Sequence, residues 1–115
     1  RTGIACHLLA GDDIPLDDSR ATTLFRIVQE SLTNVTRHAE ASQVDIGLSL
    51  EVEHIRLEIA DNGKGFDPSQ VGGNSFGLLG MGERLEALGG KLRIDSAPGR
   101  GTRLHITIPL AEELP

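Results

Sequence analysis

The sequence lacks tryptophan and tyrosine, has three phenylalanines and holds a single cysteine, Cys6, among its 115 residues. One cysteine cannot form an intrachain disulfide or a cysteine-based metal site, and this favours a reducing, cytoplasmic setting. The scarcity of aromatic rings removes the stacking surfaces that bind single-stranded nucleic acid. No apolar run approaches the ~20 residues of a membrane-spanning helix, and no signal peptide is recognisable. We therefore expect a domain that neither binds nucleic acid nor inserts into a membrane.

The charge balance is acidic, with 17 acidic and 11 basic side chains and a formal net charge of −6. An acidic surface also disfavours nucleic acid as a partner. A hydrophobic fraction of 38% argues against disorder, and a chain of this length fits one domain, which we expect over residues 1–115. Glycine is abundant, and many of the 14 glycines lie between Gly63 and Gly101, which predicts unusual loops there.

Hydrophobic periodicity predicts helices near residues 17–39 and 79–88, and strands near residues 3–10, 44–50, 55–59, 91–96 and 102–109. Either Asp17 or Asp18 can cap the first helix. The two adjacent strand pairs favour an α+β two-layer sandwich, a mixed five-stranded sheet with helices on one face. The apolar stripe of the first helix is expected to consist of Ala21, Leu24, Val28, Leu32, Val35 and Ala39.

Four short segments could carry chemistry. Glu30, Asn34 and His38 are four residues apart, so they line one side of the first helix, either beside a crevice or merely in solvent. Asp61, which ends a hydrophobic strand, begins an Asp-Asn-Gly-Lys-Gly segment that suits either a flat ligand or an ordinary Asx-turn. The others are Gly77-Leu78-Leu79-Gly80, a glycine-rich helix start that could bind phosphate, and Gly99-Arg100-Gly101-Thr102, which alone reads as a hairpin turn.

Taken together and in this order, the segments resemble the N, G1, G2 and G3 boxes of sensor histidine kinases. Residues 30–39 (Glu-Ser-Leu-Thr-Asn-Val-Thr-Arg-His-Ala) resemble the N box. Their sequence is most similar to the N box of the nitrate-sensor and DesK-like subfamily. The resemblance covers residues 16–110 and implies the Bergerat-type ATP-binding fold shared with gyrase, Hsp90 and MutL. ATP and Mg²⁺ are the cofactors that it implies.

The resemblance implies a role for each matched residue on the adenine side. Asp61 would accept a hydrogen bond from the adenine amino group, and this would select adenine over guanine, which has a carbonyl there. Thr102 would assist Asp61 through a water molecule. Gly63 and Gly65 would let the backbone lie against the base.

On the phosphate side, Asn34 would hold Mg²⁺ through its amide oxygen, and Glu30 would act as the general base. Either Arg37 or His38 would meet the phosphates or the ribose. The triphosphate would be wrapped by Gly77, Leu78 and Gly80, with residues 66–76 as a lid.

The sequence also departs from the family pattern. It has no F box between G1 and G2, which suits the nitrate-sensor subfamily, and it has Ser75 and Gly82 where that subfamily often has glycine and arginine. No phosphoacceptor histidine segment is present. His7, His54 and His105 are expected to be ordinary strand or surface residues, because no two of them have the spacing of metal ligands.

The resulting hypothesis is the catalytic domain of a longer sensor histidine kinase. It would donate the γ-phosphoryl of ATP to a histidine on a separate dimerisation domain, and a response regulator would follow as partner. The domain alone would not phosphorylate itself, and its parent protein could be membrane-anchored. The alternatives are an anti-sigma-factor serine kinase or an ATP hydrolase of the same fold, or a degenerate module that binds a partner without catalysis.

Overall fold

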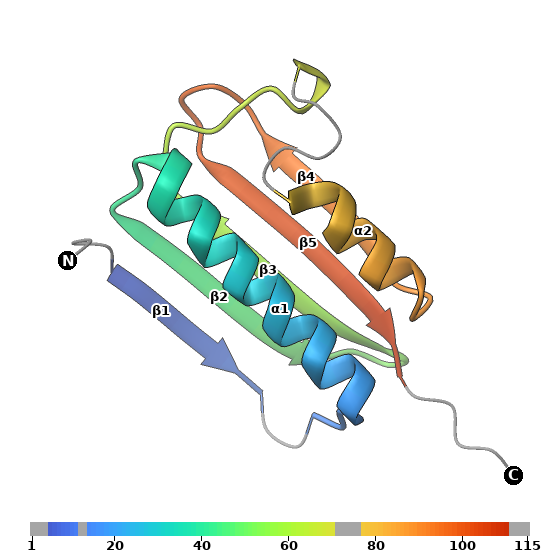
Figure 1. Ribbon diagram of the computed structural model, residues 1–115. Helices are drawn as coiled ribbons and strands as arrows, with labels where there is room; N and C mark the ends of the chain where they lie inside the picture. The colour runs from blue at the N-terminus through green and yellow to red at the C-terminus, as the bar shows by residue number, and fades with distance from the viewer. Residues whose placement is uncertain (1–4, 12–13, 71–76, 111–115) are drawn as a thin grey trace, which may run out of the picture.

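The computed structural model describes residues 5–11, 14–70 and 77–110, and it contains a mixed five-stranded sheet in the order β1-β2-β3-β5-β4 (Figure 1). Strand β1 runs parallel to β2, and the other neighbours are antiparallel. The strands are β1 (Ala5–Ala10), β2 (Gln43–Leu50), β3 (His54–Asp61), β4 (Lys91–Ser96) and β5 (Thr102–Pro109). The predicted strands are therefore confirmed within the described residues.

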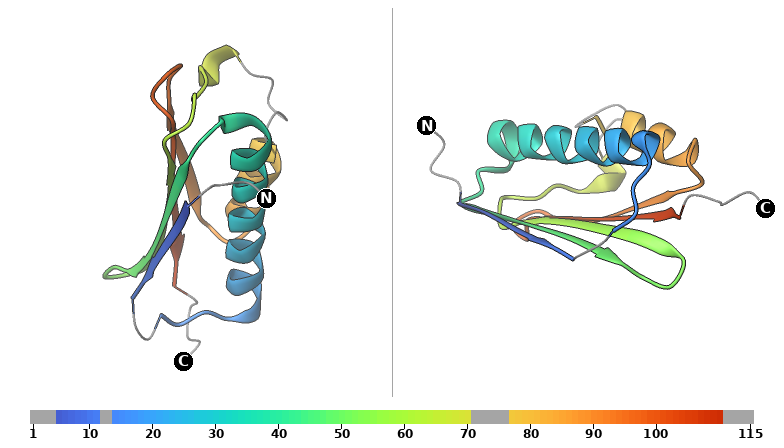
Figure 2. Two further views of the ribbon diagram at one scale, coloured as in Figure 1. Left: turned by 90° about the vertical axis from the view of Figure 1, so that its left-hand side faces the viewer. Right: turned by 90° about the horizontal axis from the view of Figure 1, so that it is seen from below.

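Helices α1 (Asp18–Asn34) and α2 (Leu78–Glu86) lie side by side on one face of the sheet, and the opposite face is open (Figure 2). This arrangement confirms the predicted α+β two-layer sandwich. A π-helical segment, Val35–Ala39, continues α1 to the predicted end of the helix, and Pro68–Gln70 form a single 3-10 turn. Of the predicted lid, residues 71–76 lie outside the described residues. No helix in the described part of the chain is both long and apolar enough to span a membrane.

The first helix begins where Asp17 accepts a hydrogen bond from the backbone N–H of Arg20 at 2.8 Å, an N-cap that satisfies one of the free N–H groups of the first turn. Its buried face differs from the predicted stripe. Ala21 is exposed, whereas Ile27 is fully buried and is joined by Ser31. The prediction for Ala21 is wrong because the helix rests on the sheet along the line through Leu24 and Ile27. The side chain of Ala39 lies outside the described residues.

The core fills the space between the two helices and the sheet. Strands β2, β3 and β5 contribute alternate buried residues to it, whereas β1 is exposed along its whole length. Met81 and Leu85 of α2 are buried, as predicted. Leu88 packs against this core. The open face carries charged pairs instead, such as Arg103 with Glu58 at 2.7 Å. The hydrophobic side of the sheet therefore holds the helices over the carboxyl end of β3, where Asp61 lies.

The turn between β4 and β5 packs against Asp61. Gly99 and Gly101 both have positive φ, at 81° and 70°. A Cβ on Gly99 would meet open space, whereas a Cβ on Gly101 would collide with the backbone carbonyl of Asp61. The two glycines thus share a positive φ but differ in their surroundings.

We expect Gly101→Ala to lower the free energy of unfolding by ~3 kcal/mol or more, because left-handed strain and a backbone collision add together. The matched variant Gly99→Ala should lose only ~1 kcal/mol, the cost of the left-handed conformation alone. Urea denaturation of both variants measures the difference. Equal losses would show that Gly101 does not hold the turn against Asp61.

Candidate functional site

A pocket opens between α1 and the sheet, at the end where β3 stops and α2 starts. Its walls come from the end of α1, the ends of β3 and β5, the loop after β3 and the first residue of α2. The lining residues are Ser31, Asn34, Val35, Ile59, Asp61, Lys64, Gly65, Phe66, Leu78, Thr102 and Leu104. Within the described residues, the structure thus brings together five of the predicted site residues, namely Asn34, Asp61, Gly65, Leu78 and Thr102.

The strand register places the polar residues of this pocket in one row. Asp61 is paired with Thr102, and Thr102 with Ser96, across β3, β5 and β4. On the other side, Asp61 is paired with Val44 of β2, which is fully buried. The row therefore faces the helices, because paired residues of neighbouring strands point to the same side of the sheet.

Asp61 is half-buried at the end of an apolar strand. The backbone N–H of Gly63 donates to its Oδ1 at 2.8 Å, and the backbone N–H of Thr102 also donates to its carboxylate. Loss of solvent raises the pKa of Asp61, and these two hydrogen bonds oppose the rise. The site therefore holds a shielded carboxylate, which favours a ligand that donates a hydrogen bond to it. Gly63 is buried behind this carboxylate and contributes through its backbone N–H.

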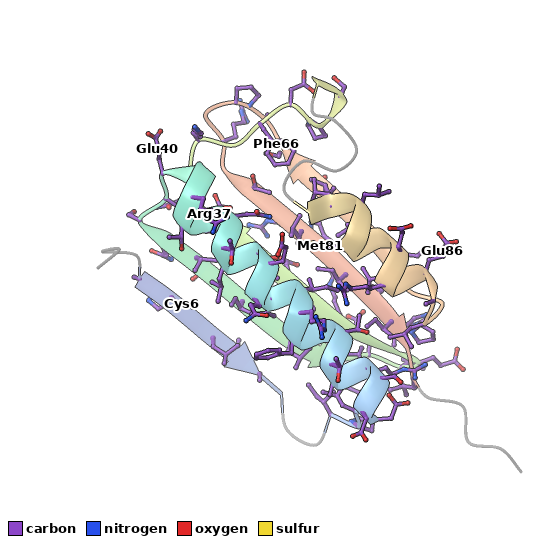
Figure 3. All side chains as sticks on the ribbon, in the orientation of Figure 1. Cys6, Arg37, Glu40, Phe66, Met81 and Glu86 are labelled. Atoms are coloured by element: carbon purple, nitrogen blue, oxygen red, sulfur yellow. The ribbon has the colours of Figure 1, made fainter. Side chains whose placement is uncertain are left out.

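The hydroxyl of Thr102 belongs to a small network. Ser96 Oγ donates to the carbonyl of Gly101 at 3.0 Å and accepts from the backbone N–H of Phe66 at 2.9 Å. It also lies 2.9 Å from Thr102 Oγ1. Since the one hydroxyl hydrogen of Ser96 goes to Gly101, Thr102 is the donor in this pair. The network ties the loop after β3 to β4 through Phe66, which Figure 3 labels on that loop.

Asn34 is the last residue of α1, where the α-helix changes to the π-helical segment. Segments of π-helix are often found at functional sites. The amide oxygen of asparagine is a hard ligand that suits Mg²⁺. No group of three or more His, Cys, Asp or Glu residues that could hold a metal ion occurs in the described ranges. A single amide oxygen fits Mg²⁺, because this ion usually takes few protein ligands and completes its shell with phosphate oxygens and water.

Other predicted residues lie in neighbouring depressions. Glu30 lines a cleft between α1 and α2 together with Gly77 and Gly80, and Arg26 and Arg84 stand at the same cleft. Glu30 packs so closely on Gly77, which has a φ of 69°, that a Cβ there would collide with its carboxylate. The sequence predicted that Glu30 lies on one side of the first helix. It did not predict the contact with Gly77 at the start of α2.

The two basic candidates of the N box lie at the end of the helix layer. Arg37, labelled in Figure 3, is exposed. It lines a separate depression with Thr33 and Thr36. The backbone of His38 belongs to the π-helical segment, and its side chain lies outside the described residues.

Sequence reasoning missed two residues of the pocket region, Ser31 and Ser96. Ser31 is buried and lines the pocket, and Ser96 organises the network at Thr102. A signal for Ser31 was present in the sequence. Leu24, Ile27, Ser31 and Val35 follow helical spacing, so Ser31 is a polar residue in the middle of an apolar stripe.

Residues 19–112 match the family described as histidine kinase-, DNA gyrase B-, and HSP90-like ATPases. The chain belongs to this family. The match covers most of the chain, including the pocket residues, all of α2 and all but the first residue of α1. Members of this ATPase family bind ATP, so the chain is the ATP-binding catalytic domain of a histidine kinase.

Two similar curated proteins are histidine kinases. The chain is 44% identical over 90 residues to the sensor histidine kinase LiaS of Bacillus subtilis, covering 78% of the chain and 25% of LiaS. It is 40% identical over 107 residues to the histidine-protein kinase/phosphatase DegS of Brevibacillus brevis, covering 93% of the chain and 27% of DegS. The chain thus spans about a quarter of the length of these relatives. They confirm the histidine kinase branch and the DesK-like subfamily.

Solved structures of histidine kinases have the same fold. The blue-light activated histidine kinase EL346 of Erythrobacter litoralis superposes with a TM-score of 0.76 at 26% identity, covering 96% of this chain and 36% of that one. The histidine kinase AdeS of Acinetobacter baumannii gives a TM-score of 0.80 at 16% identity, covering 96% of this chain and 56% of AdeS. The AdeS match supports the fold alone.

Proposed function

We propose that this ATPase domain binds Mg-ATP in the pocket between Asn34 and Asp61 and donates the γ-phosphoryl group to a histidine on a separate dimerisation domain. The domain would be one part of a longer sensor histidine kinase, with a response regulator as the next acceptor, and would act in the cytoplasm. One observation carries the proposal. A shielded carboxylate from the sheet and an amide from the helix line the same pocket.

Asp61 supports adenine as the base. Its carboxylate can only accept hydrogen bonds, and the adenine amino group would supply the donor that burial favours. Guanine has a carbonyl at that position and would place two acceptors against each other. Gly65, at a φ of 63°, brings the backbone of the loop to the pocket wall, where the base would lie.

The phosphates would extend from the pocket toward the start of α2. Asn34 would hold Mg²⁺ through its amide oxygen, and when bound the ion would neutralise phosphate charge. Backbone N–H groups at the start of α2, near Gly77, Leu78 and Gly80, suit an anion. Arg37 or His38 would contact the phosphates or the ribose from the end of the helix layer.

Glu30 would act as the general base for the attacking histidine, because it stands one helical turn before Asn34 and beside the start of α2. We expect Glu30→Gln to lower the rate of phosphoryl transfer by about 100-fold or more, a typical contribution of general base catalysis. The same variant should bind ATP as the wild type does. An unchanged rate in transfer assays with radiolabelled ATP would remove Glu30 from this role.

The proposal is tested by adding Mg-ATP to the domain in a calorimeter and then supplying the dimerisation domain of the same kinase in trans. We expect saturable binding, no autophosphorylation of the domain alone, and label on the supplied histidine domain. No heat of binding would contradict nucleotide binding and favour a degenerate module. Binding followed by release of phosphate to water, with no labelled protein, would favour a hydrolase of the same fold.

A further inference from the structure

We propose that Ser31 reads the adenine base, its hydroxyl donating a hydrogen bond to a ring nitrogen next to the amino group, N1 or N7, directly or through one water molecule. This inference rests on the proposed function and adds a specificity-determining residue to the same site. Ser31 is not part of the motif positions to which the resemblance gave roles.

The hydroxyl of Ser31 is buried without a partner. The residue is 3% exposed, and Oγ is one of two buried side-chain polar atoms without a hydrogen bond in the part of the chain that the structure describes, the other being His105 Nδ1. A buried hydroxyl without a partner costs free energy, so native proteins rarely retain one without a reason. A bound ligand would supply the missing partner.

Two other hydroxyls, one on α1 and one on the π-helical segment that continues it, have hydrogen-bond partners. Thr33 Oγ1 donates to the carbonyl of Gln29 at 3.0 Å, and Thr36 Oγ1 donates to the carbonyl of Leu32 at 2.9 Å. Such bonds to the carbonyl four residues earlier are the usual solution for serine and threonine within a helix. Ser31 does not use it, although its position in the helix offers the same opportunity.

Ser31 lies on the pocket wall that α1 provides, whereas Asp61 lies on the wall that the sheet provides. Its neighbours along the buried stripe, Ile27 and Val35, are apolar. An apolar residue at position 31 would continue this stripe. Ser31 is therefore a polar residue on the helix side of the pocket, with its hydroxyl buried at that wall.

The pocket needs a hydrogen-bond donor for adenine. The amino group of the base would donate to Asp61, and the ring nitrogens beside it, N1 and N7, are acceptors. Thr102 cannot supply its hydroxyl hydrogen in the observed network, because it donates to Ser96. The hydroxyl of Ser31, in contrast, has its hydrogen available.

The test compares the wild type, Ser31→Ala and the control Thr33→Val in binding ATP, 1-deaza-ATP and 7-deaza-ATP, by titration calorimetry. Thr33→Val removes a hydroxyl that lies outside the pocket and should leave all three affinities unchanged. Ser31→Ala should weaken ATP binding by about 5- to 10-fold, the effect of one neutral hydrogen bond. With the analogue that lacks the contacted nitrogen, Ser31→Ala and wild type should bind equally.

Two outcomes would overturn the role of Ser31. One is equal ATP affinity of wild type and Ser31→Ala. The other is an equal loss with ATP and both analogues, which would show a packing effect. Failure of the wild type to bind any of the three nucleotides would instead contradict the proposed function itself. Thermal unfolding without nucleotide adds a second readout, because removing an unpaired hydroxyl should leave the melting temperature of Ser31→Ala unchanged or higher.

Discussion

Asp61→Asn is expected to weaken ATP binding by about 10- to 100-fold, since one hydrogen bond to a charged group contributes ~1.5–3 kcal/mol. The substitution keeps the size of the side chain, and its amide oxygen can still accept the hydrogen bond that Gly63 donates at 2.8 Å. What it removes is the negative charge that would meet the adenine amino group inside the pocket. Titration calorimetry at neutral pH measures the loss.

Asp45→Asn is the matched control, because it removes the same charge from the open side of the sheet. Asp45 is exposed and pairs with His7 at 3.0 Å, away from the pocket residues. Its substitution should leave ATP affinity unchanged. The preference for ATP over GTP should shrink only in Asp61→Asn. If that variant bound ATP as tightly as the wild type, Asp61 would not contact the base.

Asp61→Asn, which should weaken ATP binding, should in contrast stabilise the ligand-free domain. Burial raises the pKa of Asp61 in the folded state, so over the pH interval between the ordinary and the raised value the folded chain binds more protons than the unfolded chain. The free energy of unfolding of the wild type therefore falls as pH rises through this interval. Above the interval, where Asp61 is ionised in both states, the full loss is present. Asp61→Asn should be more stable than wild type at neutral pH, and the gain should disappear below the ordinary pKa of aspartate, ~4. Urea denaturation at several pH values measures this trend.

The elements of the fold followed from local patterns, because each strand or helix imposes its own spacing on apolar residues. The alternation in residues 44–50 and 55–59 located β2 and β3, and Gly89, at a φ of 74°, lies just beyond α2 where a stop was expected. Local patterns did not predict the rotation of α1 about its own axis. Ala21 and Ile27 are both apolar, and only contact with the sheet decides which of them is buried.

The site residues show the same difference between what local patterns predict and what tertiary packing decides. The sequence identified Asp61 by its place at the end of a strand, and Asn34 by its spacing from Glu30 and its resemblance to the N box, and the fold then places both on one pocket. Ser31 and Glu30 are adjacent in the sequence, yet Ser31 faces the pocket and Glu30 faces α2. Their separation depends on how α1 packs between the sheet and α2, which no local pattern specifies. Tertiary packing thus determines which N-box residues could touch the base.

Asn34→Ala is expected to abolish the gain in ATP affinity that Mg²⁺ provides. The amide oxygen of Asn34 is the proposed protein ligand, and the described residues hold no acidic or histidine cluster that could replace it. Losing even an outer-shell partner costs about 10- to 100-fold in metal affinity, so losing a ligand should cost at least as much. Calorimetric titrations with ATP in Mg²⁺ and in EDTA give the gain for each variant.

Asn34→Asp is the matched control for this prediction, because a carboxylate oxygen is also a hard ligand for Mg²⁺. It should keep the Mg²⁺-dependent gain that Asn34→Ala loses, although both variants change the same position at the end of α1. In EDTA, Asn34→Ala should bind ATP about as weakly as the wild type, since the adenine contacts at Asp61 are intact. A normal Mg²⁺-dependent gain in Asn34→Ala would mean that another group holds the ion, and the phosphate end of the site would then have to be reassigned.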